Sequence, residues 1–128
     1  MNPMASEKLL RQHLDNVFET YIKKRDKYAC VVTGVKRNLV LRRMVDSDIF
    51  SVRYDPDNAF MVSKALSDSF DKNPEPILSW YLGHHTVEDL YALSHARRRK
   101  VTSTDIINKV NSIVGLTDPI RNRGRWDD

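Results

Sequence analysis

The chain has 128 residues, a hydrophobic content of 41%, a charged content of 30% and a formal net charge of +4. These values are typical of one globular domain with a single hydrophobic core, and the mild positive charge favours polyanionic partners. No apolar run approaches the ~20 residues of a membrane span, so we expect no membrane association. The N-terminus lacks the pattern of a secretory signal and the chain has a single cysteine, so we expect a reducing, cytoplasmic compartment.

Residues 6–25 predict an amphipathic helix, for which Ser6 is a suitable N-cap. Apolar residues recur in this segment at helical spacing. They are Leu10, Leu14, Val17, Phe18 and Tyr21. The basic end of the segment, "KKRDK", suits the negative end of a helix dipole.

Residues 28–70 predict a ββα unit. "YACVV" and "LVLRRM" are short β-prone runs, and the turn-forming "TGVKRN" between them is typical of a hairpin. "YDPDN" predicts a further turn, because Asp-Pro disfavours a helix. "NAFMVSKALSDSF" predicts the helix of the unit. Its expected inner positions are Phe60, Met61, Ala65, Leu66 and Phe70.

Residues 77–115 predict a helical part. "ILSWYLG" is apolar almost all round, which indicates burial between other elements. Thr86 with Asp89, and Thr102 with Asp105, resemble capping boxes at the starts of two further helices. Gly115 is expected to end the last helix. The sequence thus predicts a single α+β domain over residues 1–116, with a ββα core and about four further helices, and a polar tail over 117–128.

The order of these elements resembles the phage recombination endonucleases of the Rap/NinG type, within the His-Me finger (HNH-like) nucleases. The likeness is carried by "FETYIKKRDKYACVVTG", "RYDPDNAFMVSKALS" and "HHTVEDLYALSHARRR", and it covers roughly residues 10–100. It implies a ββα unit pinned by a structural zinc ion between two Cys-x-x-Cys pairs. It also implies a histidine general base, a divalent metal ion at the scissile phosphate and an asparagine that holds a loop in shape.

The implied zinc ligands are mostly replaced in this sequence. Cys30 matches the first cysteine, but Thr33 stands at its partner position. The second pair falls on Ser63 and Leu66, which are not workable zinc ligands. We therefore expect a finger without zinc, in which Cys30 is a small buried hydrophobic residue.

The implied catalytic residues are replaced as well. The position of the general base falls on Arg42 or, with a slip of one residue, on Arg43. Arginine stays protonated and cannot act as a base. Asn58 matches the family asparagine. The resemblance therefore implies a scaffold that keeps its fold without the nuclease chemistry, any metal ion or any other cofactor.

Cationic side chains are the candidate binding residues. Arg42 and Arg43 would bind a backbone phosphate at the position where the family cleaves the phosphodiester, because guanidinium groups match the geometry of phosphate oxygens. Two surface arginines on opposite faces of a strand are the alternative. "HARRRK" places Arg97, Arg98, Arg99 and Lys100 at the end of an expected helix, more cations than its dipole requires. We predict an inactive protein that binds nucleic acid through a cationic surface, DNA in preference to RNA and with branched or single-stranded DNA as candidate ligands, and that has no small-molecule substrate.

Two other functions stay open. The acidic residues of "DSDIFSVRYDPDN" and the mild net charge suit a phage effector that binds a host or phage protein. An active nuclease would need a rearranged site, with Mg²⁺ held by carboxylates and a base supplied by a histidine. Its candidate residues are Asp46, Asp48, Asp55, His84 and His85. The two histidines precede a helix N-cap, and a solvated turn is the alternative for them.

Overall fold

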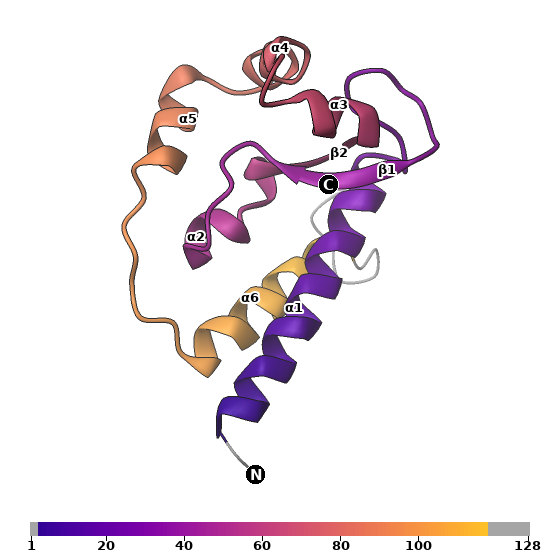
Figure 1. Ribbon diagram of the computed structural model, residues 1–128. Coiled ribbons are helices and arrows are strands. Elements are labelled where there is room, and N and C mark those ends of the chain that lie inside the picture. Colours follow the sequence, from indigo (N-terminus) through magenta and orange to yellow (C-terminus); the bar gives the residue numbers. More distant parts are fainter. Residues whose placement is uncertain (1–2, 118–128) are drawn as a thin grey trace, which may run out of the picture.

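The computed structural model describes residues 3–117, which form an α+β fold dominated by helices. In chain order the elements are α1 (Pro3–Arg25), β1 (Leu39–Arg43), α2 (Phe50–Arg53), the 3-10 turn η1 (Pro56–Asn58), β2 (Ala59–Ser63), α3 (Lys64–Ser69), α4 (Glu75–Leu82), α5 (Val87–Ser94) and α6 (Ser103–Thr117). Figure 1 shows the β1–β2 hairpin at one end of the long helix α1, with α6 returning alongside α1. The predicted α+β class is confirmed. The predicted tail lies outside the described residues, except for Thr117.

The two strands are not the pair that the sequence predicts. β1 pairs antiparallel with β2, and Leu41 lies opposite Met61. "YACVV" instead leads into a turn, in which the Gly34 N–H donates to the Cys30 carbonyl at 2.8 Å and Gly34 has a φ of +81°. The predicted first strand is therefore wrong, and the predicted helix over 58–70 is wrong in its first half, which forms β2, and confirmed over α3. The strand in "LVLRRM" is confirmed, and the ββα order is β1, β2, α3.

β2 is buried on both faces, which explains why its sequence is ambiguous. Ala59 and Met61 pack with side chains of α1 and α6, whereas Phe60 and Val62 pack against the opposite cluster. An apolar run without polar alternation fits a buried strand as well as a helix. This segment forms a strand because it pairs with β1, an interaction that cannot be recognised from the local sequence.

The end of α1 covers the outer edge of β2, the edge that faces away from β1. Arg25 Nη2 donates to the Ala59 carbonyl at 2.6 Å, and the Met61 N–H donates to Asp26 Oδ2 at 2.8 Å. The Val31 N–H donates to the Met61 carbonyl at 3.0 Å. These bonds pair the Ala59 carbonyl and both peptide groups of Met61 on the outer edge, while the ladder to β1 pairs the inner edge of β2, although the sheet has two strands.

α1 ends in a turn with left-handed backbone at two residues. The Tyr28 N–H donates to the Lys23 carbonyl at 2.9 Å, and the Lys27 N–H donates to the Lys24 carbonyl at 3.1 Å, the pattern of a Schellman motif. Lys27 and Tyr28 have φ values of 58° and 55°, a region that glycine adopts most easily. The turn directs the chain from α1 toward the edge of β2.

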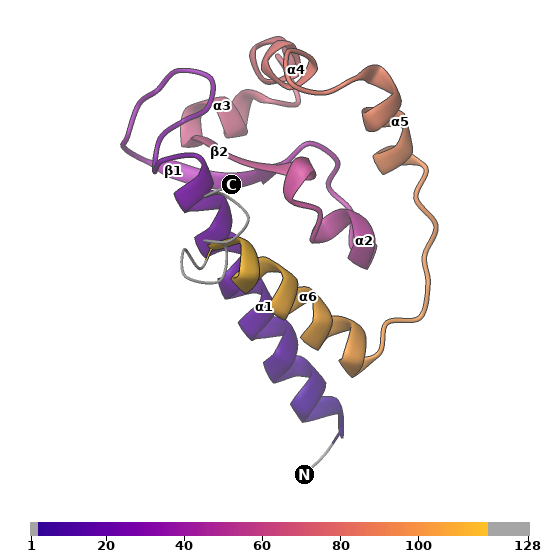
Figure 2. The same ribbon diagram turned by 180° about the vertical axis from the view of Figure 1, so that it is seen from behind.

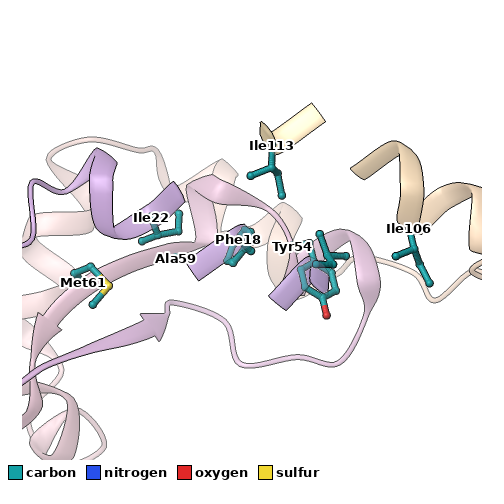
Figure 3. Packing of buried hydrophobic residues seen from close by; sticks show 8 residues of the cluster. Phe18, Ile22, Tyr54, Ala59, Met61, Ile106 and Ile113 are labelled. Atoms are coloured by element: carbon teal, nitrogen blue, oxygen red, sulfur yellow. The ribbon is translucent and has the colours of Figure 1, made fainter. Parts of the chain in front are cut away.

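The main core lies between α1, α6 and one face of the hairpin. Its buried side chains are Leu14, Phe18, Ile22, Tyr54, Ala59, Met61, Ile106 and Ile113 (Figure 3). A second cluster, on the other face of the hairpin, contains Cys30, Phe60, Val62 and Ile77. Figure 2 shows from behind that α6 lies along α1 and that α3 and α4 lie beyond the hairpin. The amphipathic pattern predicted for residues 6–25 is thus confirmed.

The predicted helix starts are also confirmed. Thr86 Oγ1 accepts from the Asp89 N–H at 3.0 Å, and Asp89 Oδ2 accepts from the Thr86 N–H at 2.9 Å. Thr102 and Asp105 make the equivalent pair of bonds before α6. Two-residue signals of this kind succeed because both partners are close in sequence.

Two expectations for the helical part are wrong. α4 is not buried all round, because Ile77 and Tyr81 are buried but Leu82 is 39% exposed. α6 runs through Gly115 to Thr117, since its packing against α1 outweighs the weak helix propensity of one glycine. Within residues 3–117 no helix has the length and apolar content to cross a membrane.

Candidate nucleic-acid interface

The side chain of Arg42 packs against α3 and hydrogen-bonds to it. Its Nη1 donates to the Ser67 carbonyl at 3.1 Å, and its guanidinium carbon lies 4.3 Å from the centroid of the Phe70 ring. The side chain is half-buried. Part of its donor capacity therefore serves the fold rather than a ligand.

Arg43, the next residue on β1, points to the opposite face of the hairpin. Its Nε donates to the Arg53 carbonyl at 2.8 Å, and its guanidinium carbon lies 5.2 Å from the Phe18 ring centroid. Burial lowers the pKa of Arg43, and the nearby Arg53 guanidinium lowers it further. The two predicted phosphate contacts thus lie on different faces, and each also links β1 to a neighbouring element.

Arg97, Arg98, Arg99 and Lys100 lie in a non-helical linker between α5 and α6. α5 ends at Ser94, and the chain then runs along the outside of the molecule to α6 (Figure 1). The expectation that these cations lie at a helix C-terminus is therefore wrong. Four consecutive charged side chains present no apolar face to a neighbour, and helices in proteins owe most of their stability to such packing. All four side chains are exposed.

Three of these cations meet a fourth at one groove, which we call the linker groove. Its volume is about 480 Å³, and its basic residues are Arg97, Arg99, Lys100 and Lys109. Asp105 is the only acidic residue among the described residues that line it, and its carboxylate accepts from the Thr102 N–H at 2.8 Å. Phe50 and Ser51 of α2 also line the groove. Four cations against one engaged carboxylate make a site of positive potential that suits phosphate groups.

Lys109 is a groove residue that sequence reasoning missed. It comes from α6, where Asp105, Lys109 and Ser112 follow each other at helical spacing and all line the groove. That spacing was readable from the sequence. The approach of this helix face to the linker was not, because it depends on how α6 packs on α1.

Arg98 does not line the linker groove. Its Nη2 lies 2.6 Å from Asp48 Oδ1, in a pair whose two side chains are 65% and 78% exposed. The hydrogen bond from Arg98 lowers the pKa of Asp48, and the same bond raises the pKa of Arg98. This pair links the linker to the loop that follows β1.

Cys30 and the other three positions that the resemblance assigns to zinc ligands lie close together. The Thr33 N–H donates to Cys30 Sγ at 3.4 Å. Burial alone would raise the pKa of the Cys30 thiol, but hydrogen bonds from Thr33 and from the backbone of Ser63 and Val32 lower it overall. Leu66 packs against the cluster that contains Cys30. Only Cys30 carries a zinc-binding atom of the usual kind, so these residues do not fit a structural zinc ion.

Asn58 is fully buried and holds the loop that follows β1. Its Oδ1 accepts from the Val45 N–H at 2.8 Å, and its Nδ2 donates to the carbonyls of Val45 and Val52 at 3.0 and 3.1 Å. Its own carbonyl accepts from the Met44 N–H at 2.8 Å. Asn58 therefore fixes the path of the chain between the two strands, and it precedes a strand rather than the predicted helix.

Four of the five residues considered for a rearranged nuclease site, all except the exposed Asp46, are engaged in local structure. Asp55 Oδ1 accepts from the N–H two residues on, and Asp48 pairs with the linker. His84 Nδ1 lies 2.9 Å from a carbonyl of α4, and His85 stacks on a tyrosine of α4. Within residues 3–117 no group of three or more His, Cys, Asp or Glu side chains is arranged to hold a metal ion.

No protein-family model, no curated protein and no solved structure matches this chain.

Proposed function

We propose that the protein is a catalytically inactive relative of the Rap/NinG-type recombination endonucleases that binds nucleic acid. Three features of the fold support the relationship. The chain has a β1–β2–α3 unit, Asn58 holds the loop inside it, and the four positions of the family's zinc ligands lie close together. Arginines stand at the positions of the catalytic histidine, and they cannot accept a proton at working pH.

The observation that carries the binding proposal is the linker groove. Arg97, Arg99 and Lys100 from the linker and Lys109 from α6 surround one concave surface, and phosphate contacts of this kind supply most of the affinity of non-specific nucleic-acid binding. Arg42 and Arg43 are secondary contacts in this proposal, because part of each guanidinium is bonded within the fold. We favour DNA over RNA as the ligand.

Fluorescence anisotropy with labelled single-stranded, duplex and branched DNA and with RNA tests the proposal. The logarithm of affinity should fall with the logarithm of salt concentration by about 0.9 per phosphate contacted on duplex DNA. Arg97→Glu with Arg99→Glu should weaken binding by about a hundredfold, since two contacts become repulsive.

Lys36→Glu with Lys72→Glu is the matched control. It makes the same change of net charge at two exposed residues outside the groove. Equal losses in the two double variants would show that net charge, and not the groove, drives binding. An affinity that does not depend on salt concentration would contradict the proposal.

A protein partner is the second candidate, and the surface of α5 favours it. Val87 and Tyr91 of this helix are 63% and 64% exposed, and α5 has no fully buried residue. Affinity capture from a lysate, with and without nuclease treatment, separates the two functions. Proteins that stay bound after nuclease digestion, and are lost from a Tyr91→Ala variant, would support a protein partner. Loss of every bound protein on digestion would argue against one.

A further inference from the structure

A second concave site of opposite charge lies between the α2–η1 segment and the α4–α5 segment. We call it the acidic crevice. Its volume is about 320 Å³, and among residues 3–117 its lining includes Asp55, Asp57 and Asp89 and no lysine or arginine. In a chain of net charge +4, three carboxylates in one lining give this site a negative local potential, although Asp57 also lines an adjoining hollow that contains Arg25 and Lys27.

Tyr81 of α4 also lines the acidic crevice, and its hydroxyl is unpaired. The side chain is fully buried, and the ring of His85 stacks on it with centroids 4.5 Å apart. Among the buried side-chain polar atoms of residues 3–117, the Tyr81 hydroxyl is the one without a hydrogen-bond partner. Burial raises the pKa of Tyr81, and the charges of the three aspartates raise it further. The group is therefore a neutral phenol whose oxygen can accept a hydrogen bond.

The three carboxylates differ in how far the fold uses them. Asp55 Oδ1 accepts from the Asp57 N–H at 2.9 Å, and Asp89 Oδ2 accepts from the Thr86 N–H at 2.9 Å. The carboxylate of Asp57 makes no such bond to another described residue, and its side chain is exposed. Asp57 is therefore the carboxylate with most capacity for a ligand.

We propose that the acidic crevice binds the guanidinium or ammonium group of a short-chain organic cation, held by the Asp57 carboxylate and the Tyr81 hydroxyl. A cation with several N–H donors matches both the charge of the carboxylates and the unpaired oxygen of the phenol. Val52 and Leu93, which also line the crevice, provide apolar surface for the alkyl chain. This assignment does not depend on nucleic-acid binding, since phosphate groups would be repelled here.

Titration of the full chain with n-butylguanidinium and with n-butylammonium, followed by backbone amide NMR shifts, tests the proposal. Saturable shifts are expected for Asp57, Tyr81 and Asp89 with both cations, and not with neutral n-butanol. Asp57→Asn should weaken binding of the cations about tenfold, the effect of one nearby charge. Asp71→Asn, an exposed carboxylate outside the crevice, is the control and should leave the affinity unchanged.

Tyr81→Phe should weaken binding about threefold, the effect of one hydrogen bond, with an amide spectrum that shows an intact fold. Absence of saturable shifts, equal shifts with n-butanol, or unchanged affinity in either Asp57→Asn or Tyr81→Phe would overturn the assignment. A capped Gly-Arg-Gly tripeptide distinguishes the source of the cation. Affinity equal to that of n-butylguanidinium assigns the crevice to an arginine of a partner protein, and affinity at least tenfold weaker assigns it to a free small cation.

Discussion

Cys30 and Thr33 form a hydrogen-bonded turn in which the Thr33 N–H lies 3.4 Å from Cys30 Sγ. Ser63 and Leu66 repeat this relationship, because the Leu66 N–H lies 3.3 Å from Ser63 Oγ. In both pairs the side chain of the first residue accepts from the backbone three residues later. The same spacing is that of Cys-x-x-Cys, and the two pairs meet at the second hydrophobic cluster.

The triple variant Thr33→Cys, Ser63→Cys, Leu66→Cys is therefore expected to bind about one zinc ion per chain, as four thiolates at this spacing would complete a tetrahedral site. Elemental analysis and a thermal melt with and without chelator measure the metal and its effect on stability. The control places a cysteine at Val32 instead of Thr33, which turns one ligand away. A zinc content as low in the triple variant as in the control would contradict the proposed relationship to zinc-pinned nucleases.

Asn58→Ala should lower the free energy of unfolding by about 3 kcal/mol, because it removes three hydrogen bonds of a fully buried side chain, two to the peptide groups of Val45 and one to the Val52 carbonyl. Chemical denaturation measures the loss, and hydrogen exchange at Val45 should speed up more than exchange in α1. Asn73→Ala, at an exposed asparagine, is the control. A loss below about 1 kcal/mol would show that Asn58 does not fix this loop.

The free energy of unfolding should fall at high pH because of the ionisation of Tyr54. Its hydroxyl donates to Asp15 Oδ1 at 2.5 Å; burial raises the pKa of Tyr54, and this bond raises it further. The free energy of unfolding that this raised pKa contributes is fully present below the unfolded-state pKa of about 10. It is lost as pH rises through the higher folded-state pKa, because the unfolded chain then binds fewer protons than the folded one. Denaturation curves from about pH 8 to 11 should show a weaker decline for Tyr54→Phe than for the wild type. Tyr28→Phe, at a tyrosine that is 54% exposed, should follow the wild type.

Lys27→Gly should raise the free energy of unfolding by about 0.5–1 kcal/mol, because glycine adopts the left-handed conformation at φ 58° without a Cβ clash. Thermal denaturation provides the measurement. Lys24→Gly, inside α1, should lower stability by about 1 kcal/mol. The same sign for both substitutions would contradict a left-handed backbone at Lys27.

Arg42→Gln and Arg43→Gln should each lower the free energy of unfolding by about 1–2 kcal/mol, because each loses a bond to a carbonyl and a contact over an aromatic ring. Arg97→Gln should change stability by less than about 0.5 kcal/mol and reduce DNA affinity more than either of them. Parallel denaturation and anisotropy measurements separate these effects. A stable Arg43→Gln variant that no longer binds DNA would show that the interface lies at β1 and not at the linker.

Local signals in the sequence predicted local structure well. The helix over residues 6–25 and the capping pairs at Thr86 and Thr102 were identified because their determinants lie within a few residues of each other. The strands were harder. "YACVV" has β propensity, but the left-handed Gly34 turns it, and β2 is buried on both faces and lacks the alternation of a half-exposed strand.

The candidate sites depend still more on contacts between distant segments. Arg97 and Lys100 were identified from their clustering in the sequence, but Lys109 joins them only through the packing of α6 on α1. In the sequence Tyr81 is an ordinary apolar-helix residue, and only the folded chain places its unpaired hydroxyl beside a crevice that three aspartates also line. Sequence patterns give residue types and periodicity, whereas these sites arise from tertiary packing.

Arg25 and Asp26 cover the outer edge of β2, and this cover also protects the chain from aggregation. An uncovered strand edge is a template for pairing with another chain, and β2 is almost entirely apolar. This edge is closed by the last turn of α1, far away in sequence. Any event that loosens the last turn of α1, such as proteolysis near its end, would open this edge and favour self-association.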